Sequence, residues 1–139
     1  MNITDTEIIL TFDDMLFISK MYNRSAPDSL RRDNPTEYMV GVWLGWFFAN
    51  NANLAPYISS IVQITIVRPD GWEPGDVIPG EPDPHPGVIV EIDHADRRYR
   101  LTTSADGLIA LPRRLAGRKN TIGRALVAAI NATRIGRSR

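Results

Sequence analysis

Cysteine is absent from this chain of 139 residues, and histidine occurs only twice. The lack of thiols excludes disulfide bonds, cysteine nucleophiles, cysteine-ligated zinc and iron–sulfur clusters. The sequence also lacks a glycine-rich phosphate loop, a dinucleotide fingerprint and a serine-hydrolase motif. No motif therefore requires an enzyme, and we expect no cofactor and no bound metal.

Long apolar runs are missing as well. The most apolar stretch is shorter than the roughly 20 residues that a membrane-spanning helix needs, and it is bounded by Glu37 on one side and by Asn50 and Asn51 on the other. The first ten residues have no basic segment ahead of their apolar ones, unlike a signal peptide. We expect a single-domain cytoplasmic protein that contacts no membrane.

The same apolar stretch predicts the central element of the fold. Asn34 suits a helix cap, Pro35 suits the first helical position, and Glu37 completes a capping box. We therefore expect a helix from Pro35 to about Asn50, buried on most sides because apolar residues cover every face. Small residues recur at every fourth position and indicate close packing within the fold or, alternatively, a homodimer contact. They are Gly41, Gly45 and Ala49.

The N-terminal segment fits two alternatives. Thr4 and Glu7 have the spacing of a capping box, and apolar residues follow at helical spacing, which predicts a helix over residues 5–22. The alternative is a short strand over residues 8–12, followed by a helix capped at Asp13. In both cases a polar link leads to the central helix.

Alternating apolar residues predict an antiparallel sheet in the second half of the chain. Residues 60–67 predict one strand in which Val62, Ile64 and Ile66 share a face. Three more segments, separated by turns, predict a meander with one buried and one charged face. These segments are residues 88–93, 98–102 and 108–111. The sequence thus predicts an α+β fold with about four strands, similar in shape to a small SH3-like barrel.

Two further segments complete the domain. Residues 72–87 contain five prolines and three glycines, which predicts an extended surface loop. Residues 120–134 predict a C-terminal helix with an apolar stripe. We expect a helical part over residues 1–52, a sheet over residues 58–111, and this last helix packed on the sheet.

Charge is distributed unevenly although the net charge is zero. Residues 1–96 contain five basic and fifteen acidic side chains, a net charge of −10, whereas residues 97–139 contain eleven basic and one acidic, a net charge of +10. Such asymmetry indicates charged partners, or neutralisation of one part by the other within the fold. The residues that we expect to bind a protein partner or nucleic acid are Arg98, Arg100, Arg113, Arg114, Arg118, Lys119 and Arg124.

The strand arginines illustrate both possibilities. Arg98 and Arg100 are expected on one strand face, opposite Tyr99 and Leu101. Guanidinium groups bind phosphates and carboxylates bidentately, so this surface suits an acidic protein, or nucleic acid with Tyr99 or a tryptophan stacking on a base. Alternatively, Arg100 pairs with Glu91 across the sheet and absorbs part of the charge.

Histidine chemistry is the remaining alternative. His94 lies between Asp93 and Asp96, a pattern that suits an acid–base pair or part of a metal site. All three lie in one predicted hairpin turn, where aspartate is favoured for its bonds to the backbone, and only His85 could add a ligand from elsewhere. A solvated turn is the better interpretation.

The leading hypothesis is a small non-catalytic interaction protein. We expect an adaptor, assembly factor or inhibitor that acts on a larger protein, itself one that handles nucleic acid. The alternatives are direct nucleic-acid binding through the Arg-rich surface, and a small enzyme that uses His94 with Asp93 or Asp96.

Overall fold

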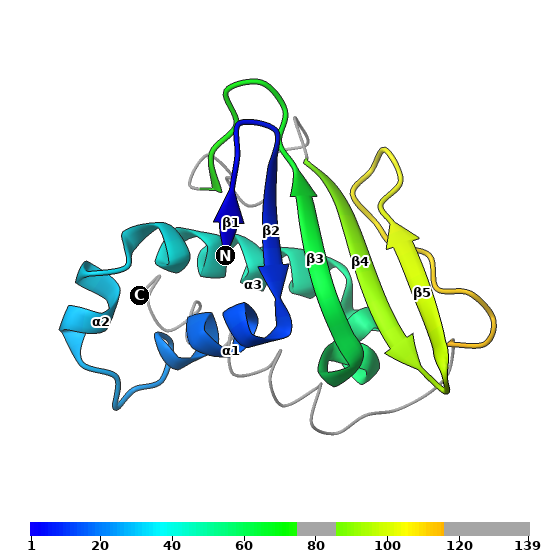
Figure 1. Ribbon diagram of the computed structural model, residues 1–139, viewed down its shortest axis with the longest axis horizontal. Helices are drawn as coiled ribbons and strands as arrows, with labels where there is room; N and C mark the ends of the chain where they lie inside the picture. Colours follow the sequence, from blue (N-terminus) through cyan, green and yellow to red (C-terminus); the bar gives the residue numbers. More distant parts are fainter. Residues whose placement is uncertain (75–85, 116–139) are drawn as a thin grey trace.

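Helices cover one side of a single sheet in the computed structural model, which describes residues 1–74 and 86–115 (Figure 1). The sheet is antiparallel, and its five strands are neighbours in chain order. The strands are β1 (Asn2–Ile3), β2 (Glu7–Thr11), β3 (Ile61–Val67), β4 (Gly87–His94) and β5 (Arg97–Thr102). The helices are α1 (Phe12–Lys20), α2 (Asp28–Arg32), α3 (Pro35–Asn50) and the 3-10 helix η1 (Ala52–Ser60).

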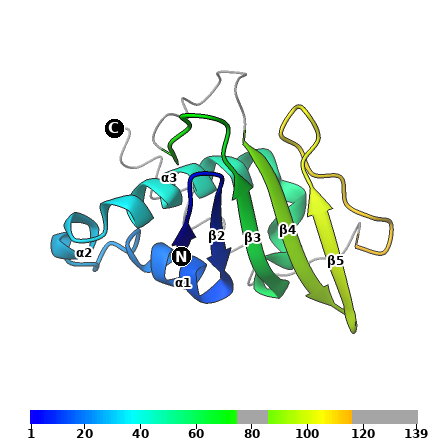
Figure 2. The same cartoon turned by 45° about the horizontal axis from the view of Figure 1, so that its top comes forward.

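The core lies between the sheet and the helices. Alternate side chains of the three central strands point toward the helices, and each of these is 2% exposed or less. They are Ile8, Leu10, Ile64, Ile66, Val88, Val90 and Ile92. The second view also places the described helices on one side only, so the other face of the sheet is the open face (Figure 2). The predicted α+β class and antiparallel sheet are confirmed, but the SH3-like barrel is not closed, because β1 and β5 are the two ends of the sheet.

The central helix has the predicted bounds, Pro35–Asn50. Trp43 and Phe47 on this helix are each 1% exposed, as expected for an element buried on most sides. The cap differs from the prediction, since the Asn34 side chain makes no cap bond and instead donates from Nδ2 to the Leu30 carbonyl. The proline at the first helical position is therefore the feature that marks where this helix begins.

Gly41 allows α1 to approach α3 closely. A β-carbon at this position would lie 2.5 Å from Cε2 and 2.6 Å from the hydroxyl oxygen of Tyr22. Tyr22 stacks on Tyr38 with ring centroids 5.6 Å apart and donates its hydroxyl to the Tyr38 carbonyl. Gly41 and Gly45 are both buried within their own chain. The stripe of small residues thus serves packing inside the fold, and only Ala49 of the three is exposed.

The N-terminal segment forms a strand and then a helix, as in the second alternative, but the strand is Glu7–Thr11 and the helix is capped by Thr11 rather than by Asp13. Thr4 and Glu7 close the turn between β1 and β2, where the Thr4 N–H donates to the Glu7 carbonyl at 2.8 Å and Thr4 Oγ1 accepts the Glu7 N–H at 3.0 Å. The capping box forms instead at the next threonine with this spacing, between Thr11 and Asp14, where both of its hydrogen bonds are present. The predicted helix over residues 5–22 is therefore wrong in its first part.

The strands also differ in detail from the prediction. The addition of β1 and β2 raises the strand count to five, whereas residues 108–111 form only an isolated bridge between Thr103 and Ile109. A bulge in β3 buries Ile61 and leaves Val62 half-buried, because the extra residue shifts the pairing.

Part of the predicted architecture lies outside the described residues. This applies to the helix over residues 120–134 and to most of the proline-rich loop over residues 72–87. Trp72 at the start of that loop is described, is 4% exposed, and meets Trp43 edge-on with ring centroids 5.9 Å apart. Among the helices in the described ranges, none is long and apolar enough to cross a membrane.

Candidate functional site

In the last strand, β5, Arg98 and Arg100 lie on one face and the apolar side chains lie on the other, which Arg97 shares at the start of the strand. Arg98 and Arg100 are exposed on the open face, whereas Leu101 is 6% exposed and Tyr99 packs against the core. This alternation follows from the pairing with β4, in which Tyr99 lies opposite the buried Ile92. The two arginines share a face, as predicted.

Arg98 is bound by two carboxylates of β4. Its Nε and Nη2 donate to the two carboxylate oxygens of Asp93, which lies directly opposite, and its Nη1 donates to Glu91 Oε2 at 3.2 Å. The hydrogen bond from the Arg98 guanidinium holds the pKa of Asp93 below its ordinary value. Exposed pairs of this kind contribute little to stability, but they occupy the guanidinium of Arg98.

Arg100 has no such pair. It lies directly opposite Glu91, as predicted, but Glu91 is bonded to Arg98, so the expected Glu91–Arg100 ion pair is replaced by Arg98–Glu91. Five exposed arginines have no carboxylate oxygen within 4.0 Å among the residues that the structure describes. One of them, Arg24, lies between α1 and α2, and the other four lie on β5 or in the segment after it. These four, the free arginines, are Arg97, Arg100, Arg113 and Arg114.

Two asparagine side chains hold the segment after β5 against the helices. Asn51, which is 2% exposed, accepts the Ile109 N–H at 2.8 Å and donates from Nδ2 to the Gly107 carbonyl at 3.2 Å. Asn53 donates from Nδ2 to the Ile109 carbonyl at 2.8 Å. This asparagine clamp uses both backbone groups of Ile109, which are then not available for the strand predicted over residues 108–111.

The clamp positions Arg113 and Arg114. Ile109 and Leu115, on either side of them, are 4% and 0% exposed, so the two exposed arginines lie in a short turn between buried anchors. Both ribbon views place this turn beyond the outer side of β5 (Figures 1 and 2). From the asparagine-rich run after α3 we predicted only the end of that helix; the signal missed was that asparagine side chains commonly bind loop backbone.

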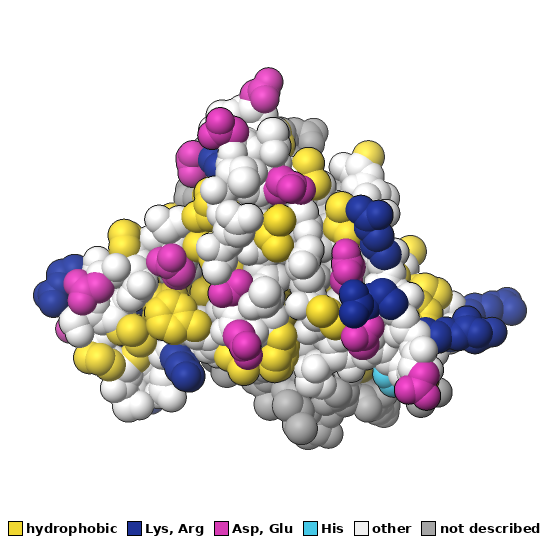
Figure 3. Space-filling model, viewed as in Figure 1, with side chains coloured by type: hydrophobic (Ala, Val, Ile, Leu, Met, Phe, Trp, Pro, Cys, Tyr) yellow, Lys and Arg dark blue, Asp and Glu magenta, His cyan; other side chains and the backbone are white. Residues whose placement is uncertain are grey.

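The remaining sequence candidates lie outside the described residues. They are His85, Arg118, Lys119 and Arg124. Figure 3 shows Lys and Arg side chains gathered over β5 and the turn beyond it, and a second basic group at the opposite end of the molecule, around α2. Acidic side chains are spread over the face between them. The charge asymmetry of the sequence is thus partly reproduced on this surface.

The described strands place no Phe, Tyr or Trp side chain on the open face of the sheet, and Phe12 of α1 lies in the groove beside Asp93 rather than beside the free arginines. Tyr99 faces the core, and Trp43 and Trp72 are 1% and 4% exposed. Trp46 lies on α3, on the other side of the sheet. Base stacking by Tyr99 or a tryptophan, which the nucleic-acid hypothesis invoked, therefore has no side chain beside the free arginines.

His94 and its neighbouring aspartates point in different directions. His94 lies on the core side of β4, where its ring meets Tyr57 edge-on at 5.4 Å, whereas Asp93 is on the open face. Its Nε2 is buried and has no hydrogen-bond partner in the described part of the chain. Asp96 lies in the hairpin turn with φ 61°, next to Ala95 with φ 51°. This geometry does not assemble an acid–base pair.

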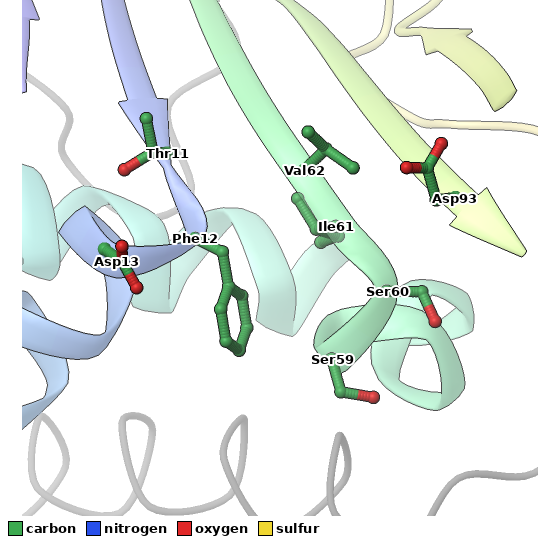
Figure 4. Close-up of a pocket in the computed structure, with 8 residues that line it drawn as sticks. All are labelled: Thr11, Phe12, Asp13, Ser59, Ser60, Ile61, Val62 and Asp93. Carbon is green, nitrogen blue, oxygen red and sulfur yellow. The ribbon is translucent and has the colours of Figure 1, made fainter.

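A groove of about 580 Å³ lies where α1, η1, β3 and β4 meet. Figure 4 shows its two carboxylates, Asp13 and Asp93, on opposite sides, with Phe12 and Val62 between them. The described residues contain no group of three side chains suited to a metal ion. The groove therefore brings no reacting or ligating groups together. Its lining consists of Thr11, Phe12, Asp13, Ser59, Ser60, Ile61, Val62 and Asp93.

Comparisons with protein-family models, with curated proteins and with solved structures find no match for this chain. A function has to be inferred from the chemistry of a site rather than from the fold alone. The free arginines beside β5 are the feature that offers such chemistry.

Proposed function

We propose that this is a small non-catalytic interaction protein, an adaptor, assembly factor or inhibitor, that binds an acidic surface of a larger protein. The observation that carries the proposal is the group of four free arginines at one end of the sheet, without acidic partners among the described residues. A guanidinium group binds a carboxylate bidentately with strong, directional hydrogen bonds. The free arginines therefore suit carboxylates presented by another protein.

Two features favour a protein over nucleic acid. Glu91, Asp93 and Asp96 lie among the arginines; discrete carboxylates of a partner can avoid them, but the dense charge of a phosphate backbone cannot. The described strands also place no Phe, Tyr or Trp side chain on the open face, where a single strand could stack a base beside the free arginines. The net charge of −10 over residues 1–96 further supports a partner that has a basic surface of its own, as nucleic-acid-handling proteins do.

The test is capture of a partner from an extract of the cells that produce the protein, at moderate salt and after nuclease treatment. The basic-edge variant replaces Arg97, Arg100, Arg113 and Arg114 with serine. The control variant replaces Lys20, Arg24, Arg31 and Arg32 at the opposite end with serine, so that both variants lose the same charge. The parent and the control should retain one defined protein that the basic-edge variant loses. Equal retention by all three, or loss of the protein after nuclease treatment, contradicts the proposal.

Direct nucleic-acid binding is the second candidate, because the free arginines would also bind phosphates. It is tested by titrating labelled single- and double-stranded DNA and RNA at two salt concentrations. Micromolar binding that weakens steeply with salt, and that is lost in the basic-edge variant but not in the control, supports it. Absence of binding at low salt removes it.

A further inference from the structure

The outer edge of β5 has backbone groups that pair with no described strand. β4 and β5 are joined by the two-residue turn Ala95–Asp96, so His94 and Arg97 form the first hydrogen-bonded pair of the hairpin. Hydrogen-bonded and non-hydrogen-bonded pairs then alternate along an antiparallel ladder. Arg97, Tyr99 and Leu101 thus bond to β4, and the backbone groups of the residues between them point outward.

The bond from the Thr103 N–H to the Val88 carbonyl, at 3.0 Å, fits this alternation, because Thr103 continues the inward-bonding series. Arg98 and Arg100 therefore present their backbone N–H and C=O groups to the outside. Within the part of the chain that the structure describes, these groups have no hydrogen-bond partner. The nearest pairing, between Thr103 and Ile109, lies beyond the end of β5.

Side-chain chemistry specifies what could pair there. An added strand would place alternate side chains on the open face, beside Arg98 and Arg100, and the others on the side of Tyr99 and Leu101. Arg100 is free, and Arg113 and Arg114 lie beyond the same edge. A second copy of this chain would bring like charges together along paired β5 edges, which is unfavourable. An extended segment with alternating acidic and apolar residues is the complementary occupant.

We infer that β5 binds an extended acidic segment of the partner protein by adding it to the sheet as a sixth strand. This inference rests on the proposed function and specifies how the same arginines bind. Main-chain hydrogen bonds to Arg98 and Arg100 supply part of the affinity, and carboxylates opposite the arginines supply the specificity, as in other cases of strand addition. The free edge and the free arginines thus form one binding surface.

Amide hydrogen exchange of the full chain tests this, with a short capped peptide in which glutamate alternates with valine as the probe. Saturation with the peptide should slow exchange at Arg98 and Arg100 by at least about tenfold, because their N–H groups become bonded. Exchange at Tyr99 and Leu101, already bonded to β4, should change little. Peptide binding that leaves exchange at Arg98 and Arg100 unchanged overturns strand addition.

Two matched comparisons, one between modified peptides and one between variants of Arg100, test whether main-chain hydrogen bonds contribute to binding. N-methylation of the peptide amides that face β5 should weaken binding about fivefold or more, whereas methylation of the outward amides should not. Arg100→Pro removes the same side chain as Arg100→Ser and, in addition, the outward N–H; proline is tolerated at a strand edge. Weaker binding of Arg100→Pro, with both variants folded by circular dichroism, supports the inference, and equal binding overturns it.

The outcomes separate this inference from the proposed function. Salt-sensitive binding of the peptide that is lost in the basic-edge variant, but is indifferent to N-methylation, overturns strand addition and keeps the proposed function. Failure of the parent to bind the peptide, while the extract experiment still gives an arginine-dependent partner, also overturns strand addition alone. Tighter binding of an oligonucleotide than of the peptide, displacing it from the free arginines, overturns both.

Discussion

Gly41 is a residue at which close packing excludes even a methyl group. In Gly41→Ala the new methyl group would meet the Tyr22 ring at 2.5 Å, and the ring is held by its hydrogen bond to the Tyr38 carbonyl. We expect the free energy of unfolding to fall by about 2 kcal/mol, as for other overpacked sites. Gly87→Ala is the control, because the nearest atom there is Val67 Cβ at 3.7 Å. Denaturant unfolding should show that Gly87→Ala lowers the free energy of unfolding by less than about 0.5 kcal/mol.

Asn51 is a buried residue whose side chain hydrogen-bonds to the backbone of Phe47, Gly107 and Ile109. Asn51→Ala leaves the Ile109 N–H and the Gly107 carbonyl without their side-chain partner, and we expect a loss of about 2–3 kcal/mol. Asn50→Ala should change the free energy of unfolding by less than about 0.5 kcal/mol, because Asn50 is exposed and its side chain bonds, among the described residues, only to the Trp46 carbonyl. Hydrogen exchange at Ile109 should accelerate in the first variant only; equal exchange in both would contradict the clamp.

At the scale of elements, the β4–β5 hairpin closes through an unfavourable turn. Ala95 and Asp96 both have positive φ, 51° and 61°, a geometry for which Asn-Gly is the preferred pair. The double change Ala95→Asn with Asp96→Gly should raise the free energy of unfolding by about 1 kcal/mol, because a left-handed backbone is costly for alanine. The control is Ala105→Asn, in a turn where this residue does not have a positive φ. It should not raise the temperature of thermal unfolding.

The first helix is tied to the first strand through Asp14. Burial acts to raise the pKa of Asp14, but the hydrogen bonds from the Met1 amine and from Thr11 outweigh it, so this pKa lies below the ordinary 3.8. A folded pKa below the unfolded value means that the carboxylate stabilises the fold above pH 3.8 and that this stabilisation is lost as pH falls through the folded pKa.

Asp14→Asn should therefore lower the free energy of unfolding by about 1 kcal/mol near neutral pH, through loss of the charged cap and its pair. The difference from the parent should shrink below pH 3.8, where the parent carboxyl also becomes protonated. Urea unfolding across this range is the measurement. A difference that stays constant with pH would show that the charge of Asp14 does not contribute.

At the scale of the whole molecule, the α+β class and the antiparallel sheet were predictable from the sequence, but the number of strands and the long-range hydrogen bonds were not. The bounds of α3 follow from one continuous apolar run after Pro35. Whether β2 is a strand or part of a helix was ambiguous, because the capping-box pattern, a threonine with an acidic residue three positions later, begins at both Thr4 and Thr11. The pairing of β2 with β3 decides that the second threonine caps the helix. The asparagine clamp joins residues 58 positions apart, which no local periodicity reports.

The candidate site, too, was only partly predictable from the sequence. Alternation alone placed Arg98 and Arg100 on one face. It did not reveal that Arg98 would take both Asp93 and Glu91 and leave Arg100 free, because diagonal contacts between strands depend on side-chain reach as well as on register.

Arg98 consequently determines whether Glu91 is paired or is free to reach Arg100. Arg98→Ala should release Glu91 to Arg100, which lies directly opposite, and weaken binding of the acidic probe peptide by about threefold to tenfold. The triple change Arg98→Ala, Glu91→Gln, Asp93→Asn removes the released carboxylates and should restore parental affinity. Peptide titration of both variants is the measurement; weakened binding in the triple variant would show that Arg98 itself contacts the peptide.

The asparagine clamp also decides how the molecule responds to mechanical load. A partner that pulls on Arg113 or Arg114 transmits tension along the chain in both directions, and it reaches the buried anchors Ile109 and Leu115 before it reaches β5. At Ile109 the clamp passes the force to Asn53 of η1 and to Asn51 at the end of α3. A load applied at Arg113 or Arg114 would therefore reach the clamp and Leu115 before it reaches the hydrogen bonds that join β5 to β4.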